Sequence, residues 1–375
     1  MKSALIDTDI LSLFFRNGSK VTAIVYRGFF VNSVIGIFMN ASDEYNDPLN
    51  VDVEDLFVGS LLGGAIGDAL GSFCEGWTRT RILGVDQILS GYRDRVNKSG
   101  EVRLLAGAYT DDTQQLLVVV ESILACGKVE AEDLAARYLA LWRAGELHSY
   151  GAAFKETLEK LDEGVPWEEA GSVDKPSNGA VMKIAPVGLW HWVTGEDIRE
   201  AALAVSWVTH RDQRAVAAAV SIAHVVGHLV THRPLDLNEV LDVAEWSARP
   251  IHEPTGALIG RVRELLRMDA GLAWQTMREM AVRPLEDGIP GEGAMTAVVA
   301  LEAFLRSPKS FEATIIRALT AGGDVDTFAA VAGNLSGVYN GTAKLPDYLM
   351  DDLLERSRIE SLARALYQKT LIREV

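Results

Sequence analysis

Cysteine is scarce in this chain of 375 residues, which contains only Cys74 and Cys126. Two cysteines cannot build a disulfide framework, and they are typical of a protein in a reducing compartment. Basic residues are also in short supply, because 36 lysines and arginines face 52 aspartates and glutamates, for a net charge of −16. This balance argues against binding to a nucleic-acid backbone, since phosphate neutralisation requires clustered lysine and arginine.

An uninterrupted hydrophobic run of membrane-spanning length is missing. The most apolar stretch, Val21 to Met39, contains Arg27, Asn32 and several small residues. A membrane span needs about 20 predominantly apolar residues, and no small-residue cleavage site of a signal peptide follows this stretch. We therefore expect no membrane association and a cytoplasmic location.

Three zones differ in composition along the chain. Residues 1–40 are rich in β-branched and aromatic residues, as strands are, and the polar residues 40–50 are typical of a linker. From Val53 onward the segments have helical length and period. We predict a short, β-containing N-terminal extension and linker over residues 1–50 and an all-α body over residues 51–375. The start of the extension resembles the first strand and helix of PIN-domain ribonucleases, but no room is left for the rest of that fold.

The first predicted helix carries glycine at every fourth position, at Gly59, Gly63, Gly67 and Gly71. This spacing places all four on one side of a helix. Each glycine costs about 1 kcal/mol of helix propensity relative to alanine, so we expect another backbone to pack closely against this side. Asp68 and Glu75 accompany the segment, which excludes a transmembrane dimer motif.

A cluster of carboxylates and hydroxyls precedes each of two further apolar helices, predicted over residues 114–127 and 327–341. The first cluster is Thr110, Asp111, Asp112 and Thr113, and the second, after a Gly-Gly pair, is Asp324, Asp326 and Thr327. Helix capping is one explanation, because Asp and Thr are favoured N-caps and acids in a first turn contribute about 0.3–1 kcal/mol. A cation site is the other, since adjacent carboxylates repel each other unless a cation neutralises them. Two clusters of the same form favour the cation site.

The residue types in these clusters indicate a hard cation. Mg²⁺ prefers oxygen ligands, and four carboxylates could serve two ions about 3.5–4 Å apart. Neither cluster contains cysteine or histidine, which disfavours zinc. Glu75 follows the glycine-rich helix in a loop that could aim it at the same site, whereas Asp68 could orient ligands from behind. Cys74 lacks a nearby base and is interpreted as a buried residue.

Two loops offer groups that could bind a substrate. Residues 174–190 combine a Ser-Asn-Gly turn with the start of a helix, whose free backbone N–H groups could hold a phosphate. His210 and Arg211 lie at another boundary between a loop and a helix. An ordinary structural loop is the alternative for both.

Five segments resemble the ADP-ribosylglycohydrolase family in the order that the family has them: GAIGDALGSFCEG, YTDDTQ, SNGAVMKIAPVGL, VTHRDQ and GGDVDTFAAVAGNLSGVYNG. That family includes dinitrogenase-reductase-activating glycohydrolases and hydrolases of ADP-ribosyl-arginine and ADP-ribosyl-serine. The resemblance spans about residues 53–375 and implies one compact all-α domain, where length alone suggests two. It also implies a hydrolase that cleaves the glycosidic bond between ADP-ribose and a modified side chain or small molecule and so reverses ADP-ribosylation.

The resemblance also implies roles for individual residues. Two Mg²⁺ ions, or Mn²⁺ in their place, are expected to be held by Thr110, Asp111, Asp112, Asp324, Asp326 and Thr327. Substrate binding is assigned to Ser177, Asn178, Gly179, Met182, His210, Gly322 and Gly323. Catalysis is assigned to Glu75, Asp111 and Asp112, with one of these carboxylates as the general base.

Some features depart from the family pattern. Many members have a hydroxyl residue where this chain has Val325, and an asparagine where it has Ala321. The first 50 residues lie outside the family core, and in some bacterial members such an extension plugs the active site of an ADP-ribosylating toxin. A partner-binding protein that occludes a toxin, with or without hydrolase activity, is therefore the alternative function. A metal-dependent phosphohydrolase would need basic groups around a transferring phosphate, which the sequence does not obviously supply.

Overall fold

The computed structural model describes residues 52–372, which lie within a unit that spans residues 48–375. The strand-rich extension, the linker and the ribonuclease-like segment predicted for residues 1–50 lie outside the described residues.

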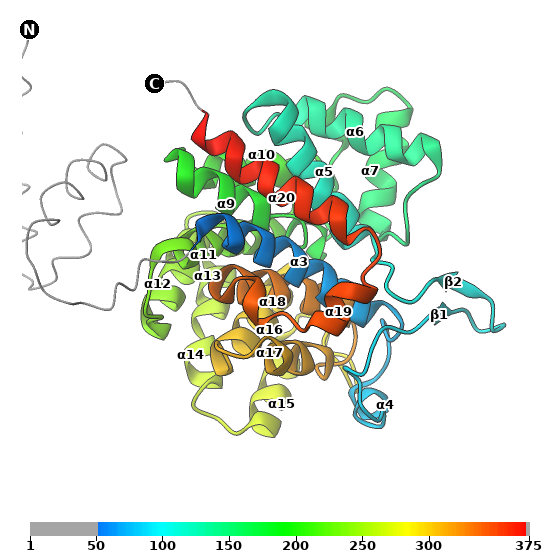
Figure 1. Cartoon of the computed structure of the whole chain (residues 1–375), viewed down its shortest axis with the longest axis vertical. Coiled ribbons are helices and arrows are strands. Elements are labelled where there is room, and N and C mark those ends of the chain that lie inside the picture. Colours follow the sequence, from blue (N-terminus) through cyan, green and yellow to red (C-terminus); the bar gives the residue numbers. More distant parts are fainter. Residues whose placement is uncertain (1–51, 373–375) are drawn as a thin grey trace, which may run out of the picture. The chain divides into compact units, whose positions relative to one another are not determined.

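Two glycine-rich helices, α3 (Val53–Ser72) and α18 (Val325–Asn340), lie side by side at the centre of the domain (Figure 1). A Cβ atom on Gly63 would lie 2.5 Å from the carbonyl oxygen of Gly333, and one on Gly67 would lie 2.1 Å from that of Ala329. Real Cβ atoms essentially never approach other atoms within 3.0 Å. The close backbone approach predicted from the four-residue spacing is therefore confirmed.

The second apolar segment forms α5 (Asp111–Cys126), which is buried over most of its length. It ends at Gly127, whose φ of 70° is the left-handed conformation that glycine adopts readily at helix ends. The C-terminal helix α20 (Arg356–Leu371) packs against both α3 and α5. Packing against α20 thus holds α5 in the core, as packing against α3 holds α18.

The helix α11 (Gln213–Thr231) runs through the core beside α9 (Ala185–Thr194), α12 (Leu237–Ala248) and α16 (Gly293–Arg306). By length and composition alone it is apolar enough to cross a membrane, but 83% of its apolar window is buried within the domain. A core helix accounts for this composition.

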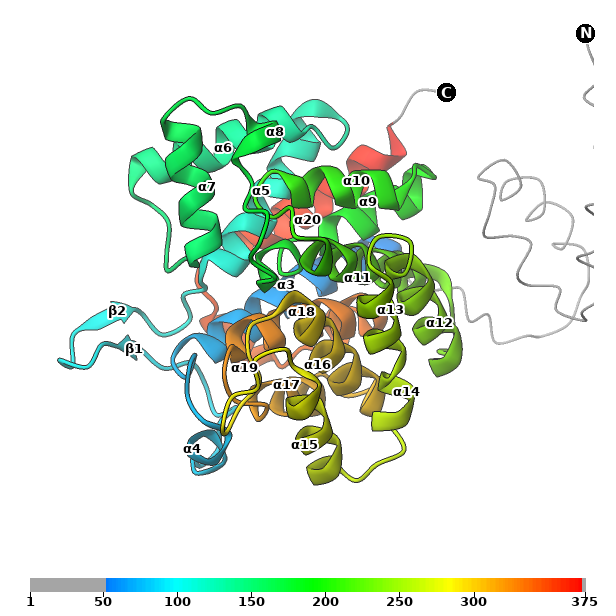
Figure 2. The ribbon, with the colours of Figure 1, turned by 180° about the vertical axis from the view of Figure 1, so that it is seen from behind.

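The remaining helices cover this centre on several sides (Figure 2). They are α4 (Arg79–Leu83), α6 (Ala131–Ala144), α7 (Ala152–Asp162), α8 (Trp167–Ala170), η1 (Asn178–Ala180), α10 (Ile198–Trp207), α13 (Glu253–Gly260), α14 (Val262–Leu265), α15 (Ala270–Met280), α17 (Phe311–Leu319), η2 (Thr342–Lys344) and α19 (Asp347–Asp352). Strands β1 (Arg95–Val96) and β2 (Val102–Leu104) form an antiparallel hairpin, the one strand pair within residues 52–372. The all-α class predicted for the body is confirmed.

Candidate active site

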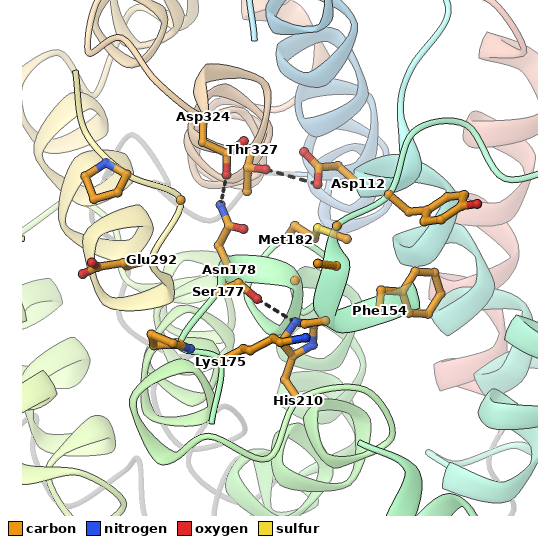
Figure 3. A pocket seen from close by; sticks show the side chains of 18 of the residues that line it. Asp112, Phe154, Lys175, Ser177, Asn178, Met182, His210, Glu292, Asp324 and Thr327 are labelled. Atoms are coloured by element: carbon orange, nitrogen blue, oxygen red, sulfur yellow. Dashed lines mark hydrogen bonds between the residues drawn. The ribbon is translucent and has the colours of Figure 1, made fainter. Parts of the chain in front are cut away.

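The N-terminal ends of α5 and α18 meet at a cavity of about 670 Å³. The predicted site residues that line it are Glu75, Asp111, Asp112, Ser177, Asn178, Gly179, Met182, His210, Asp324, Asp326 and Thr327. Figure 3 shows Asp112, Asp324 and Thr327 at one end of the view and Ser177 and His210 at the other, with Asn178 between them. The fold therefore brings the two acidic clusters and the two predicted substrate loops to one cavity.

Asp68 holds the first acidic cluster from behind. Its buried carboxylate accepts five hydrogen bonds from the backbone N–H and hydroxyl groups of Thr110 and Thr113, with the shortest, 2.6 Å, from Thr113 Oγ1. Thr110 is also the N-cap of α5, where its hydroxyl oxygen accepts a hydrogen bond from the backbone N–H of Asp112 (3.3 Å). These contacts fix the first turn of α5, which directs Asp111 and Asp112 into the cavity.

Thr110 itself lies outside the residues that line the cavity. Its hydroxyl proton is donated to Asp68 (2.8 Å), so any role as a metal ligand would use a remaining lone pair. Capping, the simpler explanation of the first cluster, is therefore correct for Thr110. It is wrong for Asp324, which occupies the N-cap position of α18 without making a capping hydrogen bond.

The carboxylates of the second cluster converge with those of the first. Oxygen atoms of Asp68, Asp112 and Asp326 all lie within 4.8 Å of one another, and so do oxygens of Glu75, Asp324 and Asp326. Asp112 Oδ2 and Asp326 Oδ1 are buried and have no hydrogen-bond partner among residues 52–372. Thr327 Oγ1 donates a hydrogen bond to the other oxygen of Asp112 (3.3 Å), which links the first turns of the two helices.

Burial and mutual repulsion raise the free energy of these carboxyl groups when they are ionised and no cation is bound. Burial raises the pKa of Asp111, Asp112 and Asp326 well above its ordinary value, and neighbouring carboxylates raise it further. Mg²⁺ and Mn²⁺ bind to oxygen ligands, and carboxylate oxygens that lack a hydrogen-bond partner and lie close to other oxygen atoms can serve as such ligands. The side chains present therefore fit a hard divalent cation, with Asp112 and Asp326 offering the unpaired oxygens.

Glu75 reaches the cavity from the loop after α3 and is about 30% exposed. Its carboxylate pairs with Arg95 on strand β1 (2.6 Å), and Arg95 also donates to Ser149 Oγ (3.3 Å). Glu75 is thus the most accessible acid of the group, held in place by the β1–β2 hairpin.

The Ser177–Asn178 loop faces the acids. Asn178 Nδ2 donates to Asp324 Oδ2 (2.6 Å) and to Thr296 Oγ1 (3.1 Å), so it ties the loop to the acidic centre. Ser177 Oγ lies 3.0 Å from Nε2 of the buried His210. A Cβ atom on Gly179 would lie 2.4 Å from the His210 ring, which explains the need for glycine there. The helix start predicted within residues 174–190 lies at Ala185, where α9 begins, and the Ser-Asn-Gly turn itself forms the 3₁₀ turn η1.

Gly322 and Gly323, which were predicted to bind substrate, also lie outside the residues that line the cavity. Both have left-handed backbone, with φ of 73° and 89°, and Gly323 exchanges hydrogen bonds with the loop that carries Glu75 (Gly323 N–H to the Trp77 carbonyl, 2.8 Å; Gly76 N–H to the Gly323 carbonyl, 2.7 Å). Gly323 thus holds that loop in place, whereas the Gly322 carbonyl accepts a hydrogen bond from the backbone N–H of Ile289 (3.0 Å). Ala321 and Val325, the two residues that differ from the family pattern, are buried in the apolar core.

Two residues behind the cavity were missed from the sequence. Gln115 donates to Asp111 Oδ2 (2.7 Å), and the fully buried Lys183 donates to Gln115 Oε1 (2.9 Å). The signal for Lys183 was present, because it is the one charged residue in the apolar run from Ala180 to Trp190. Cys74 is a buried thiol, and burial raises its pKa to about 12, so it does not supply a thiolate.

Comparison with known proteins shows the family to which this chain belongs. A profile of the ADP-ribosylglycohydrolase family matches residues 49–374. An uncharacterised protein of Archaeoglobus fulgidus is 30% identical over 319 residues, which cover 84% of this chain and 97% of that protein. Human ADP-ribosylhydrolase ARH3 is 25% identical over 347 residues, with 83% and 93% covered. The ADP-ribosyl-[dinitrogen reductase] glycohydrolase of Rhodospirillum rubrum is 25% identical over 304 residues, with 78% and 88% covered.

A solved structure described as an ADP-ribosylglycohydrolase-related protein complex superimposes with a TM-score of 0.64 at 28% identity, covering 85% of this chain and 99% of that one. The helical fold and its acidic centre define an all-α hydrolase of glycosidic bonds. This chain belongs to the ADP-ribosylglycohydrolase family, as its motifs implied.

Proposed function

We propose that this enzyme releases ADP-ribose from a modified amino-acid side chain or a small-molecule conjugate, with Mg²⁺ or Mn²⁺ as its cofactor. The observation that carries the proposal is the pair of unpaired, buried oxygens, Asp112 Oδ2 and Asp326 Oδ1, at the floor of a cavity large enough for a nucleotide-sized ligand. The related proteins named as ADP-ribosylhydrolase ARH3 and as ADP-ribosyl-[dinitrogen reductase] glycohydrolase support this substrate class.

Charge explains why a cation belongs to this function. ADP-ribose carries a diphosphate, whereas the chain has a net charge of −16 and concentrates carboxylates at the cavity. When bound, a divalent ion supplies positive charge that offsets the carboxylates and attracts the oxygens of the ribose. Asp112, Asp324, Asp326 and Thr327 are the residues that would hold it.

The remaining residues bind the substrate and move a proton. Ser177, Asn178 and Gly179 form the wall opposite the acids, where they can contact the ribose and diphosphate. Glu75 is the carboxylate with access to solvent, so we assign it as the base that takes a proton from the attacking water. Asp111, whose Oδ2 accepts from Gln115, keeps its other oxygen for the cavity.

The test is a hydrolysis assay with two substrates. The protein is incubated with ADP-ribosyl-arginine and ADP-ribosyl-serine peptides, with Mg²⁺ or with EDTA, and free ADP-ribose is measured by chromatography. We expect release from at least one peptide that depends on Mg²⁺ and is lost in Asp112→Asn. Asp269→Asn is the matched control, because Asp269 also lies at a helix N-terminus but caps α15 away from the cavity. No release from either peptide would refute the proposal for modified arginine and serine side chains.

Residues 51–375 are proposed as the catalytic domain and the cytoplasm as its location. The alternative in which the N-terminal arm occludes a toxin depends on residues 1–50, which the structure does not describe, and it stays a prediction.

A further inference from the structure

Lys183 is a fully buried lysine that lies behind the cavity, outside the residues that line it. Its Nζ atom donates to Gln115 Oε1 (2.9 Å) and to Thr209 Oγ1 (2.6 Å). It also lies 5.2 Å from the ring centroid of Tyr138 and 5.6 Å from that of Phe154. A protonated lysine has donors and no acceptor, and aromatic faces attract its charge. Two oxygens and two ring faces therefore match an ammonium group.

Toward the acidic centre, this lysine orients the Gln115 amide. Because Oε1 accepts from Lys183, the amide nitrogen is turned to Asp111, to which it donates at 2.7 Å. A flipped amide would place an N–H group against the ammonium. Asp111 is therefore held as an acceptor.

Toward the substrate loop, Lys183 also determines the direction of the next hydrogen bonds. Thr209 Oγ1 already accepts from Lys183, and within residues 52–372 its other hydrogen-bond partner is His210 Nδ1 (2.9 Å). The Thr209 hydroxyl proton is therefore donated to Nδ1. Burial lowers the pKa of His210 to about 3, so the ring is neutral and carries one proton.

That single proton must then lie on the other ring nitrogen. His210 Nε2–H donates to Ser177 Oγ (3.0 Å), and the hydroxyl proton of Ser177 is left for an acceptor in the cavity. The series runs without a break from Asp111 through Gln115, Lys183, Thr209 and His210 to Ser177.

We propose that Lys183 is a positioning residue whose charge sets the direction of this buried series, so that the Ser177 hydroxyl donates to an oxygen of the bound ligand. Only the identity of that ligand, ADP-ribose, rests on the proposed function.

The first test reads the His210 tautomer by two-bond ¹H–¹⁵N correlation of ¹⁵N-histidine-labelled protein at pH 6. His210 signals are assigned by their loss in His210→Asn. We expect Nε2–H alone in the wild type. A population with Nδ1–H is expected in Lys183→Met, and also in Thr209→Val, which removes the hydroxyl between the two residues but keeps the lysine.

Two controls distinguish a change in hydrogen-bond direction from a general loss of stability. Thr209→Ser keeps the hydroxyl and is expected to retain the wild-type tautomer. Glu302→Gln removes another buried charge, paired with Arg306 (2.8 Å) and Arg317 away from the cavity, and is also expected to leave it unchanged. If either folded Lys183→Met or Thr209→Val retains Nε2–H alone, the proposal is overturned.

The second test measures ADP-ribose affinity by calorimetry at pH 6, below the pKa of Lys183. Ser177→Ala and Lys183→Met are each expected to weaken binding about tenfold, the effect of one hydrogen bond, and the double variant no more than either alone. Independent, multiplying losses would overturn the proposal. Failure of the proposed function would show as absent ADP-ribose binding in the wild type, and the tautomer measurement would still decide the role of Lys183.

Discussion

A Cβ atom on Gly71 would lie 2.3 Å from the Cα atom of Asp326. The end of α3 therefore rests directly on the backbone of the first turn of α18, with no side chain between them. Because Asp326 contributes one of the two unpaired carboxylate oxygens, the packing of the two glycine-rich helices also sets the position of the acidic centre. Stability and catalytic geometry depend on the same contact.

Gly71→Ala is expected to lower the free energy of unfolding by about 1–3 kcal/mol, because the backbone of α18 must move to admit the methyl group. Hydrolase activity per folded molecule should fall as Asp326 is displaced. Urea unfolding and the peptide assay measure the two effects. Gly271→Ala is the control, since its Cβ atom would meet nothing closer than 3.4 Å and alanine favours the helix by up to about 1 kcal/mol. A Gly71→Ala protein as stable as wild type would contradict the contact.

Asp68→Asn is expected to cost roughly 3 kcal/mol of stability and most of the activity, because a buried acceptor of five hydrogen bonds from Thr110 and Thr113 becomes partly a donor. Asp55→Asn offers a matched comparison on the same helix. Asp55 accepts from the N–H (3.1 Å) and hydroxyl (2.6 Å) of Thr342, remote from the cavity. It should lose stability and keep its activity. Equal activity losses in the two variants would show that Asp68 has no special link to the site.

Removing one carboxylate of the acidic centre should have opposite effects with and without metal. In EDTA, Asp326→Asn is expected to raise the free energy of unfolding by about 1–3 kcal/mol, since it relieves repulsion among buried acids. Mg²⁺ should stabilise the wild type and leave this variant nearly unchanged. Thermal unfolding in both buffers checks this, with Asp269→Asn as the control. Equal Mg²⁺ stabilisation of the wild type and Asp326→Asn would exclude Asp326 as a ligand.

Lys183 predicts a pH dependence of stability. Burial lowers its pKa from 10.5 to about 7 in the folded protein. Between these values the unfolded chain binds a proton that the folded chain does not, so stability from this group rises with pH, by up to about 1.4 kcal/mol per unit. In urea unfolding from pH 7 to 9, the free energy of unfolding of the wild type should therefore increase relative to that of Lys183→Met. Parallel profiles would place the pKa of Lys183 outside this range.

Glu75→Gln is expected to lower kcat by about 10²–10⁴, the usual contribution of a general base, with little change in Mg²⁺ stabilisation. Single-turnover kinetics with a labelled peptide measures the chemical step. Glu130→Gln is the control, because Glu130 also pairs with a cation at 2.6 Å, Lys128, on the surface. If Glu75→Gln retains full kcat, the general base would have to be assigned to Asp111 or Asp112 instead.

Features carried by neighbouring residues could be predicted from the sequence. The glycine spacing of α3 required a close backbone, and the repeated acids required a cation or caps, because both arguments use only local geometry. The family resemblance assigns Gly322 and Gly323 to substrate binding, yet both lie outside the residues that line the cavity, and Gly323 is hydrogen-bonded to the loop of Glu75. Sequence proximity does not show which face of a turn meets the cavity.

The series through Lys183 could not be predicted for a different reason. Its members are separated by up to 99 residues, from Asp111 to His210. They meet only after α5, the segment before α9 and the loop before α11 have packed. A lone lysine in an apolar run indicates a buried charge, but its partners depend on tertiary structure.

The central claim is that the two helix N-termini hold the cation on which hydrolysis depends. The most direct measurement titrates Mn²⁺ into metal-free protein, follows bound Mn²⁺ by electron paramagnetic resonance, and assays ADP-ribose release on the same samples. We predict that activity rises in proportion to bound Mn²⁺ and that Asp112→Asn and Asp326→Asn lose both. Full activity in metal-free protein would contradict the claim. Tight Mn²⁺ binding by a protein that carries both Asp112→Asn and Asp326→Asn would also contradict it.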